Sequence, residues 1–241
     1  MPEQKNNEKA IFYDAEKCIG CNACVMACKA EYQWKEGDFA NHIKKIQSGS
    51  YPQVKWNFIR NACMHCTEAT CLMVCPSPGA ITKLENGTIF FDSDKCIGCK
   101  YCISNCPFGV PFYDESTKKS YKCNFCEDRV SQGKEPACVA TCLTGALSFG
   151  ERVDLIKEAK KKQAKVIYGE NELKGLHVLY ALADKPTAYE LSEEPKVPTS
   201  IWWWHKVFRP VAIWGVPFTI VASLLHYVIH GPHKIGEGGE H

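Results

Sequence analysis

The sequence predicts an α+β fold in which two cysteine-rich units are nested, one inserted into the other, and are followed by a single C-terminal transmembrane helix. Three observations support this prediction. The 241-residue chain carries 16 cysteines, all of them before residue 143. The cysteines form four quartets whose spacing repeats along the chain. Residues 211–229 contain no formal charge and are close to the length of about 20 residues that spans a bilayer.

Composition excludes other classes of protein. Charged residues make up 23% of the chain and the net charge is only +2, so no polyanion partner is expected and no nucleic acid is predicted to bind. A disulfide framework is typical of secreted domains shorter than about 100 residues. This chain is longer, and its polar opening segment is not expected to act as a signal peptide. We therefore expect free thiols that bind metal.

Two quartets are regular. The first is Cys18, Cys21, Cys24 and Cys28, and the third is Cys96, Cys99, Cys102 and Cys106, followed by Pro107. Their spacing of two, two and three residues matches bacterial [4Fe-4S] ferredoxins, in which three thiolates hold one cube and the fourth reaches a neighbouring cube. Both runs begin Cys-Ile-Gly-Cys and follow an aromatic pair and an aspartate, which indicates an internal repeat.

The other two quartets have a stretched middle. They consist of Cys63, Cys66, Cys71 and Cys75, and of Cys123, Cys126, Cys138 and Cys142. Asn86-Gly87 lies between two short apolar runs that join the second quartet to the third, which predicts a β-hairpin. Residues 57–115 are therefore predicted to form an inserted unit within an outer unit of residues 1–56 and 116–150. In the outer unit, residues 144–149 are expected to pair with a strand near residues 11–13.

This nested arrangement of two bacterial-ferredoxin-like units predicts four [4Fe-4S] clusters, each with three cysteines from one quartet and the last cysteine of its partner. The predicted ligand sets are Cys18, Cys21, Cys24 and Cys142; Cys123, Cys126, Cys138 and Cys28; Cys63, Cys66, Cys71 and Cys106; and Cys96, Cys99, Cys102 and Cys75. Structural zinc is the alternative, because zinc sites also use paired Cys-x-x-Cys motifs. Four cysteines within eleven residues are too crowded to close one tetrahedron well, which favours iron-sulfur.

Several other polar residues accompany the quartets. His65 lies between two predicted ligands and is expected to pack or hydrogen-bond near a cluster. Lys100, Lys122 and Arg129 are candidates for raising a nearby cluster's potential, although a solvated cation is the commoner outcome.

Residues 151–204 are predicted to contain a helix, a strand and a linker. Apolar residues at near-helical spacing predict an amphipathic helix over 151–167 with a solvated basic face. Residues 177–182 are predicted to form a strand, with a packing role for His177. Pro186, Pro195 and Pro198 indicate an extended linker.

The C-terminal helix is predicted over 205–230, with 211–229 inside a bilayer and a tail over 231–241. Trp202, Trp203 and Trp204 on one side and Tyr227 on the other suit the two bilayer interfaces. A buried core helix is the alternative. His226, near the far end, is a candidate contact for a haem, a quinone or a partner helix, or a hydrogen-bonding group at the interface. The N-terminal side of the predicted span carries two positive charges, Lys206 and Arg209, and the C-terminal side carries one, Lys234. This difference of one charge favours a cytoplasmic N-terminal side.

Nearly the whole chain resembles the iron-sulfur beta subunit of membrane-bound respiratory formate dehydrogenase. The cysteine runs alone also resemble subunits that serve nitrate, dimethyl sulfoxide or polysulfide reductases and some hydrogenases. The tail, with His226-Tyr227 and Gly231-Pro232, narrows the resemblance. The other matching segments are Cys63-Met64-His65-Cys66, residues 75–81, Tyr121-Lys122-Cys123, residues 128–131 and residues 135–138. Two departures are Leu143, where the family usually has proline, and a segment between Cys28 and Cys63 that looks shorter.

The resemblance implies a non-catalytic electron-transfer subunit. Its implied partners are a catalytic alpha subunit with a molybdenum or tungsten bis-pterin and a membrane cytochrome b gamma subunit that reduces quinone. The implied order of electron travel is first quartet, fourth, second and third, with the cluster domain on the periplasmic face. The chain itself shows no paired carboxylates, nucleophile arrangement or pocket motif for bond-making chemistry. The alternatives are an equivalent subunit of a hydrogenase or another molybdopterin oxidoreductase, and a membrane-tethered structural or sensory iron-sulfur module.

Overall fold

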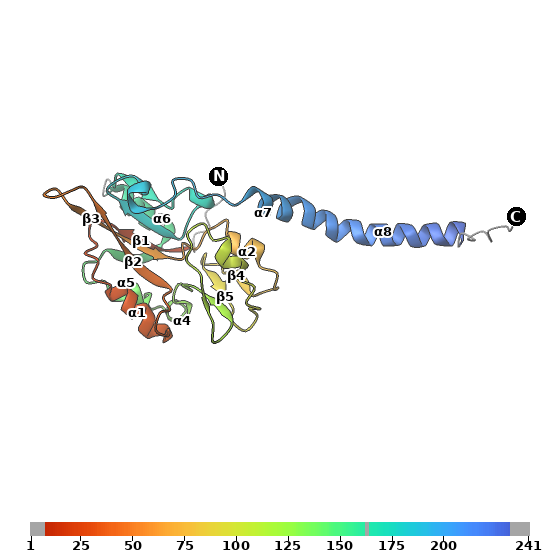
Figure 1. The fold of residues 1–241 in the computed structure, drawn as a ribbon, viewed down its shortest axis with the longest axis horizontal. Helices are drawn as coiled ribbons and strands as arrows, with labels where there is room; N and C mark the ends of the chain where they lie inside the picture. The colour runs from red at the N-terminus through yellow and green to blue at the C-terminus, as the bar shows by residue number, and fades with distance from the viewer. Residues whose placement is uncertain (1–7, 162–163, 232–241) are drawn as a thin grey trace. The chain divides into compact units, whose positions relative to one another are not determined.

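The computed structural model describes residues 8–161 and 164–231, and its contacts divide the chain after Val197. The larger unit contains a four-stranded sheet in the order β8-β1-β10-β9. Its strand β1 is labelled in Figure 1. β1 (Lys9–Asp14) pairs antiparallel with β8 (Leu147–Glu151) and parallel with β10 (Val178–Leu182), which pairs antiparallel with β9 (Val166–Tyr168). The predicted pairing of residues 144–149 with residues 11–13 is confirmed, since Ile11 lies opposite Phe149.

Side chains alternate between the two faces of this sheet, as strand geometry requires. On one face Ala10, Phe12 and Leu179 pack under α6 (Arg152–Lys161). On the other face Ile11, Tyr13 and Tyr180 pack against a core that contains cysteines of the first and fourth quartets. The sheet therefore forms a floor for the cysteine-bearing loops.

Two of the predicted elements end differently from expectation. Of the helix predicted over 151–167, the structure describes Arg152–Lys161 as α6, whereas Val166–Tyr168 form the strand β9. β-branched and aromatic residues suit a strand, and the edge of β10 offers them a partner. The predicted linker is also more ordered than expected. Pro186–Tyr189 form a 3₁₀ turn, η2, whose Tyr189 is buried.

The remaining strands form three antiparallel hairpins. β2 (Asn41–Ser48) pairs with β3 (Lys55–Ala62), β4 (Ile81–Lys83) with β5 (Ile89–Phe91), and β6 (Phe112–Asp114) with β7 (Lys119–Tyr121). The β4–β5 hairpin confirms the prediction made from Asn86-Gly87. A 3₁₀ turn, η1 (Glu172–Lys174), lies between β9 and β10.

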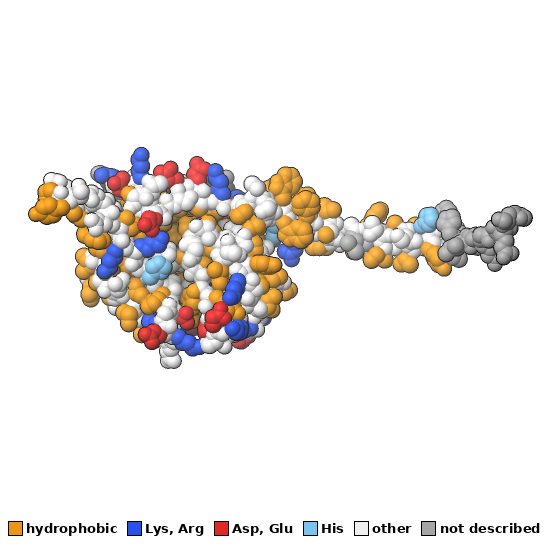
Figure 2. All heavy atoms as spheres, viewed as in Figure 1, with side chains coloured by type: hydrophobic (Ala, Val, Ile, Leu, Met, Phe, Trp, Pro, Cys, Tyr) orange, Lys and Arg blue, Asp and Glu red, His pale blue; other side chains and the backbone are white. Residues whose placement is uncertain are grey.

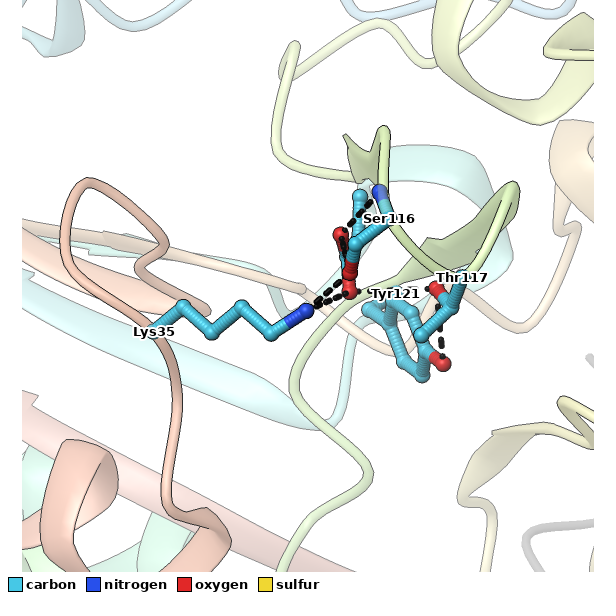
Figure 3. Close-up of polar contacts among 5 residues, drawn as sticks. Lys35, Ser116, Thr117 and Tyr121 are labelled. Carbon is cyan, nitrogen blue, oxygen red and sulfur yellow. Dashed lines mark hydrogen bonds and ion pairs between the residues drawn. The ribbon is translucent and has the colours of Figure 1, made fainter.

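Short helices carry or adjoin the cysteines. They are α1 (Ala23–Tyr32), α2 (Thr70–Val74), α3 (Tyr101–Ser104), α4 (Glu127–Val130) and α5 (Ala137–Ala140). The loop after α1 is tied to the β6–β7 turn by Lys35, which contacts Ser116 and lies 3.5 Å from the Asp114 carboxylate (Figure 3). The first quartet is thereby linked to the segment that joins the third quartet to the fourth.

The C-terminal unit is a helix. α7 (Thr199–Trp203), the π-helical turn η3 (Trp204–Phe208) and α8 (Arg209–His230) follow one another without a break. Among the described residues, Thr199–Ile229 is long and apolar enough to cross a membrane, with a mean hydropathy of 1.7. Its large apolar side chains, such as Trp214 and Phe218, are exposed (Figure 2). The helix begins at Thr199, before the predicted start at 205, because Pro198 suits the position that precedes a helix. Most of the predicted tail lies outside the described residues.

Candidate metal centres

Sixteen free thiols are gathered into four groups, which we name sites A to D. Site A contains Cys18, Cys21, Cys24 and Cys142; site B contains Cys28, Cys123, Cys126 and Cys138; site C contains Cys63, Cys66, Cys71 and Cys106; and site D contains Cys75, Cys96, Cys99 and Cys102. Each group joins cysteines from two quartets, and each has the composition that the spacing predicts. Their role as ligands is not tested by this proximity and stays a prediction.

Sites A, C and D each line a hollow of nearly equal size. The hollow at site A measures about 350 Å³ and those at sites C and D about 360 Å³, including space open to solvent. The rest of each wall is mainly apolar, with Tyr13 and Ile43 at site A, Phe108 at site C and Phe91 at site D. Three hollows of one size and one donor set suit one kind of occupant.

Site B is identified by the effect of three of its cysteines on the pKa of the fourth. Burial raises the pKa of the Cys28 thiol, and the neighbouring Cys123, Cys138 and Cys126 raise it further. All four of these cysteines are buried. Site B is therefore the most enclosed of the four groups.

The loops around the sites share one backbone device. The third residue of three Cys-x-x-Cys loops directs its N–H at the first cysteine's sulfur: Gly20 to Cys18 at 3.5 Å, His65 to Cys63 at 3.5 Å and Phe125 to Cys123 at 3.4 Å. All three residues have positive φ, as does Gly98 in the remaining loop. Hydrogen bonds to a sulfur stabilise the thiolate form. Alignment of the four quartets would have shown that His65 and Phe125 occupy the glycine position.

The donor set fits an iron-sulfur cluster. Burial raises the pKa of Cys63 to about 11 and that of Cys71 to about 12, so neither thiol would ionise alone at neutral pH. A bound metal deprotonates its thiol ligands outright. Within residues 8–161 and 164–231, no three Cys, His, Asp or Glu side chains converge closely enough to hold a single ion. The sulfurs surround a volume, as a polynuclear group requires.

The four sites follow one another through the interior. Cys24 of site A and Cys138 of site B belong to the same apolar core, against which Cys66 of site C also packs. Cys28 and Cys123 of site B share a second apolar cluster with Cys63 and Cys106 of site C. Cys66 and Cys71 of site C share a third cluster with Cys75 and Cys102 of site D. This succession, A to B to C to D, agrees with the order that the resemblance implies.

Only the two end sites contain exposed cysteines. Cys21 at site A and Cys99 at site D are exposed, whereas the remaining fourteen cysteines are buried or partly buried. Beside these two cysteines, Ile19 and Ile97 are 60% and 66% exposed. The repeated Cys-Ile-Gly-Cys motif thus presents an apolar side chain to the surface at each end of the series.

Four polar residues that the sequence singled out fall in different environments. His65 is fully buried, accepts the Ile89 N–H on Nδ1 at 3.0 Å and packs on Phe125, so the expected packing and hydrogen-bonding role is confirmed. Lys100 is exposed and pairs with Glu115 at 3.3 Å, and Arg129 pairs with Glu31 at 3.1 Å. Lys122 departs from the commoner outcome for a lysine, because it is buried at the wall of site C.

Two further functional candidates lie outside the four quartets, and for one of them, His177, the sequence predicted only a packing role. His177 does more than pack, since its Nδ1 is 2.7 Å from the carbonyl oxygen of His65. Arg60 is buried beside Cys138, with its Nη2 4.0 Å from that sulfur. Neither residue belongs to a quartet, so spacing alone gave no signal for them. His226 lies on α8 with an exposed side chain, and its role stays a prediction.

Family models match both the cysteine-rich part of the chain and its C-terminal helix. Two family models described as 4Fe-4S dicluster domain match residues 17–79 and 54–152, and the model described as formate dehydrogenase N, transmembrane matches residues 197–240. The two dicluster matches overlap over residues 54–79.

Curated relatives cover most of the chain. The nitrate-inducible formate dehydrogenase iron-sulfur subunit of Escherichia coli (strain K12) is 36% identical over 258 residues, which is 94% of this chain and 87% of that protein. The formate dehydrogenase iron-sulfur subunit of Haemophilus influenzae is 36% identical over 260 residues, 94% of this chain and 82% of that protein. A thiosulfate reductase electron transfer subunit of Salmonella typhi is 39% identical over 170 residues, 69% of this chain and 87% of that protein.

Proposed function

This chain belongs to the formate dehydrogenase iron-sulfur subunits, and we propose that its sites A to D hold its four [4Fe-4S] clusters in series. The chain is an electron-transfer subunit and is anchored in a membrane by one helix. In this proposal each of the sixteen cysteines is an iron ligand, in the four sets given above. The single observation that carries the proposal is the succession of four four-cysteine groups with exposed cysteines only at the two ends.

The protein's part in the chemistry is to bind, space and shield. A bound [4Fe-4S] cluster accepts and releases one electron at a time, at a potential set by charge, hydrogen bonds and exposure. The cysteines of sites B and C are buried or partly buried, and none of them is exposed, so two positions are shielded from water. The loop N–H groups of Gly20, His65 and Phe125 supply hydrogen bonds to sulfur. The chain thus provides a conductor, and bond-making chemistry belongs to a catalytic partner.

The proposal assigns a partner to each end. The catalytic subunit, with a molybdenum or tungsten bis-pterin, docks at site A over Ile19, and a membrane cytochrome b docks at site D over Ile97. Exposed apolar side chains next to exposed cysteines at these two sites support this assignment. The nested arrangement, with residues 57–115 inserted, is supported by the pairing of β1 with β8, which brings the outer segments together. The cluster domain is assigned to the periplasmic face because the family resemblance implies it. The positive charges that flank the membrane helix differ by one and favour the opposite orientation.

A ligand substitution in the last site tests the series. Cys102→Ser should disturb the cluster at site D, so quinone reduction by the purified complex is lost while dye reduction at the catalytic end survives. Ser104→Ala, on the same helix α3, is the matched control and should leave both activities unchanged. Equal activities in Cys102→Ser and the control would refute the assignment of site D.

Rapid mixing of the complex with formate or with hydrogen separates the formate dehydrogenase from the hydrogenase alternative. Clusters that stay oxidised during turnover would favour a structural or sensory role.

A further inference from the structure

Arg60 is a buried cation that lies between two of the four sites. It belongs to β3 and only 1% of its surface is exposed. The hydroxyl of Tyr180 donates to its carbonyl oxygen at 2.6 Å, and the hydroxyl of Tyr13 donates to the carbonyl oxygen of Phe58 at 2.8 Å. These two bonds fix the strand against the floor of the sheet, so the guanidinium group has a defined place.

Among the described residues the guanidinium group has one hydrogen-bond acceptor, the sulfur of Cys138. Nη2 lies 4.0 Å from the Cys138 sulfur, while Nε and Nη1 are buried without a hydrogen-bond partner there. No carboxylate of residues 8–161 or 164–231 forms an ion pair with Arg60. An unpaired buried charge is strongly destabilising. The uncommitted N–H groups therefore indicate an anion with several acceptor atoms at this place.

Arg60 borders both site A and site B. Its Nη2 lies 4.0 Å from the sulfur of Cys138 in site B. In the β2–β3 hairpin it lies directly opposite Ile43, which lines site A, and directly opposite residues of an antiparallel pair share one face. Lys122 and Arg152, the other buried cations among the described residues, differ in that both already donate to backbone carbonyl oxygens. Arg60 is thus the buried cation whose N–H groups remain available to donate hydrogen bonds to groups bound at sites A and B.

We propose that Arg60 is shared by sites A and B, where its guanidinium group donates hydrogen bonds to sulfur and its charge raises the reduction potentials of both clusters. This inference rests on the ligand sets proposed above. Four thiolates give each cluster a net negative charge, so a nearby cation favours the reduced state, and hydrogen bonds to sulfur act in the same direction. The planar fork of arginine can present donors to two acceptors at once, which a lysine ammonium on one stem does less well.

The test is a redox titration of the purified complex, followed by electron paramagnetic resonance without formate. The signals of sites A and B are first assigned by the changes seen in Cys21→Ser and Cys126→Ser. Arg60→Gln should lower both potentials, each by enough to change the oxidised-to-reduced ratio at least about tenfold at fixed potential, which is 59 mV for one electron. The signal of site D should not move. Lys55→Gln removes the same charge from the exposed end of the same strand and should change no potential.

Iron content separates the possible failures. A wild-type complex whose iron content shows that it lacks the clusters would overturn the proposed function. An Arg60→Gln complex with four clusters and unchanged potentials would overturn this inference alone. A fall confined to one site would also overturn it, because a shared cation must act on both. Where Arg60→Gln fails to assemble, Arg60→Lys decides. The single ammonium cannot replace the fork at both sites, so at least one of the two potentials should fall, and two unchanged potentials would overturn the inference.

Discussion

Gly87 is a position where a single methyl group should damage the segment between the second and third quartets. It lies in the β4–β5 turn with φ of +89°, and a Cβ there would lie 2.1 Å from Nε2 and 2.2 Å from Cδ2 of His177. His177 is fully buried, and its Nδ1 is hydrogen-bonded to the carbonyl oxygen of His65 at 2.7 Å. The ring cannot swing away without loss of that bond.

The cost of Gly87→Ala follows from these contacts. An alanine at left-handed φ costs about 1 to 2 kcal/mol, and forcing a methyl group into a packed interior costs about 1 to 3 kcal/mol. A combined loss of about 2 to 5 kcal/mol corresponds to a fall in Tm of about 4 to 20 °C for a unit of this size. Because His65 lies between two thiols of site C, the same change should loosen that site.

Thermal loss of the clusters' visible absorption in the purified complex measures the effect. Gly37→Ala is the matched control, since Gly37 has φ of +86° and nothing within 4 Å of the added methyl group. The control should lose only the backbone term of about 1 to 2 kcal/mol. Equal falls in Tm for the two variants would refute the argument that the contact with His177 determines the cost.

Three further changes test charge, docking and pH. Lys122→Met should lower the potential of the site C cluster, because it removes a buried cation from the wall of that site; a redox titration in which the signals of sites A and C shift together would contradict this. Ile97→Asp should cut quinone reduction at least about tenfold and spare dye reduction, whereas Ile19→Asp should cut both, since a buried unpaired charge costs more than the roughly 1.4 kcal/mol that tenfold represents; identical profiles for the two variants would count against two docking ends. Hydrogen bonds from the Ser116 hydroxyl and N–H hold the pKa of Asp114 well below its usual range, with help from Thr117 and Lys35. The stability that this carboxylate contributes is present above the unfolded-state pKa of about 3.9 and is lost as pH falls towards the lower folded-state pKa. The difference in Tm between wild type and Asp114→Asn should therefore stay constant from pH 8 to pH 5, and a steady decline over that range would show that another group is responsible.

Local chemistry made much of the architecture predictable. Cysteine spacing predicts which side chains gather, because two or three intervening residues limit the reach of each loop, and the structure brings together the same four groups of cysteines. Asn86-Gly87 predicted its hairpin because the turn type depends on two residues. The uncharged run at 211–229 predicted the long apolar helix because length and composition suffice for that prediction.

Tertiary structure decided what surrounds the cysteines. The apolar pattern before β9 continued a helical period, and only the open edge of β10 made Val166–Tyr168 a strand. Arg60 and Lys122 look in the sequence like ordinary cations, yet both are buried, because strands distant in the chain close over them. Burial of a charge depends on every segment packed around it, and no local spacing encodes that. By itself, therefore, the sequence determined the number, the grouping and the predicted class of occupant of the sites. Long-range packing decided which charges face the sites and which two cysteines reach the surface.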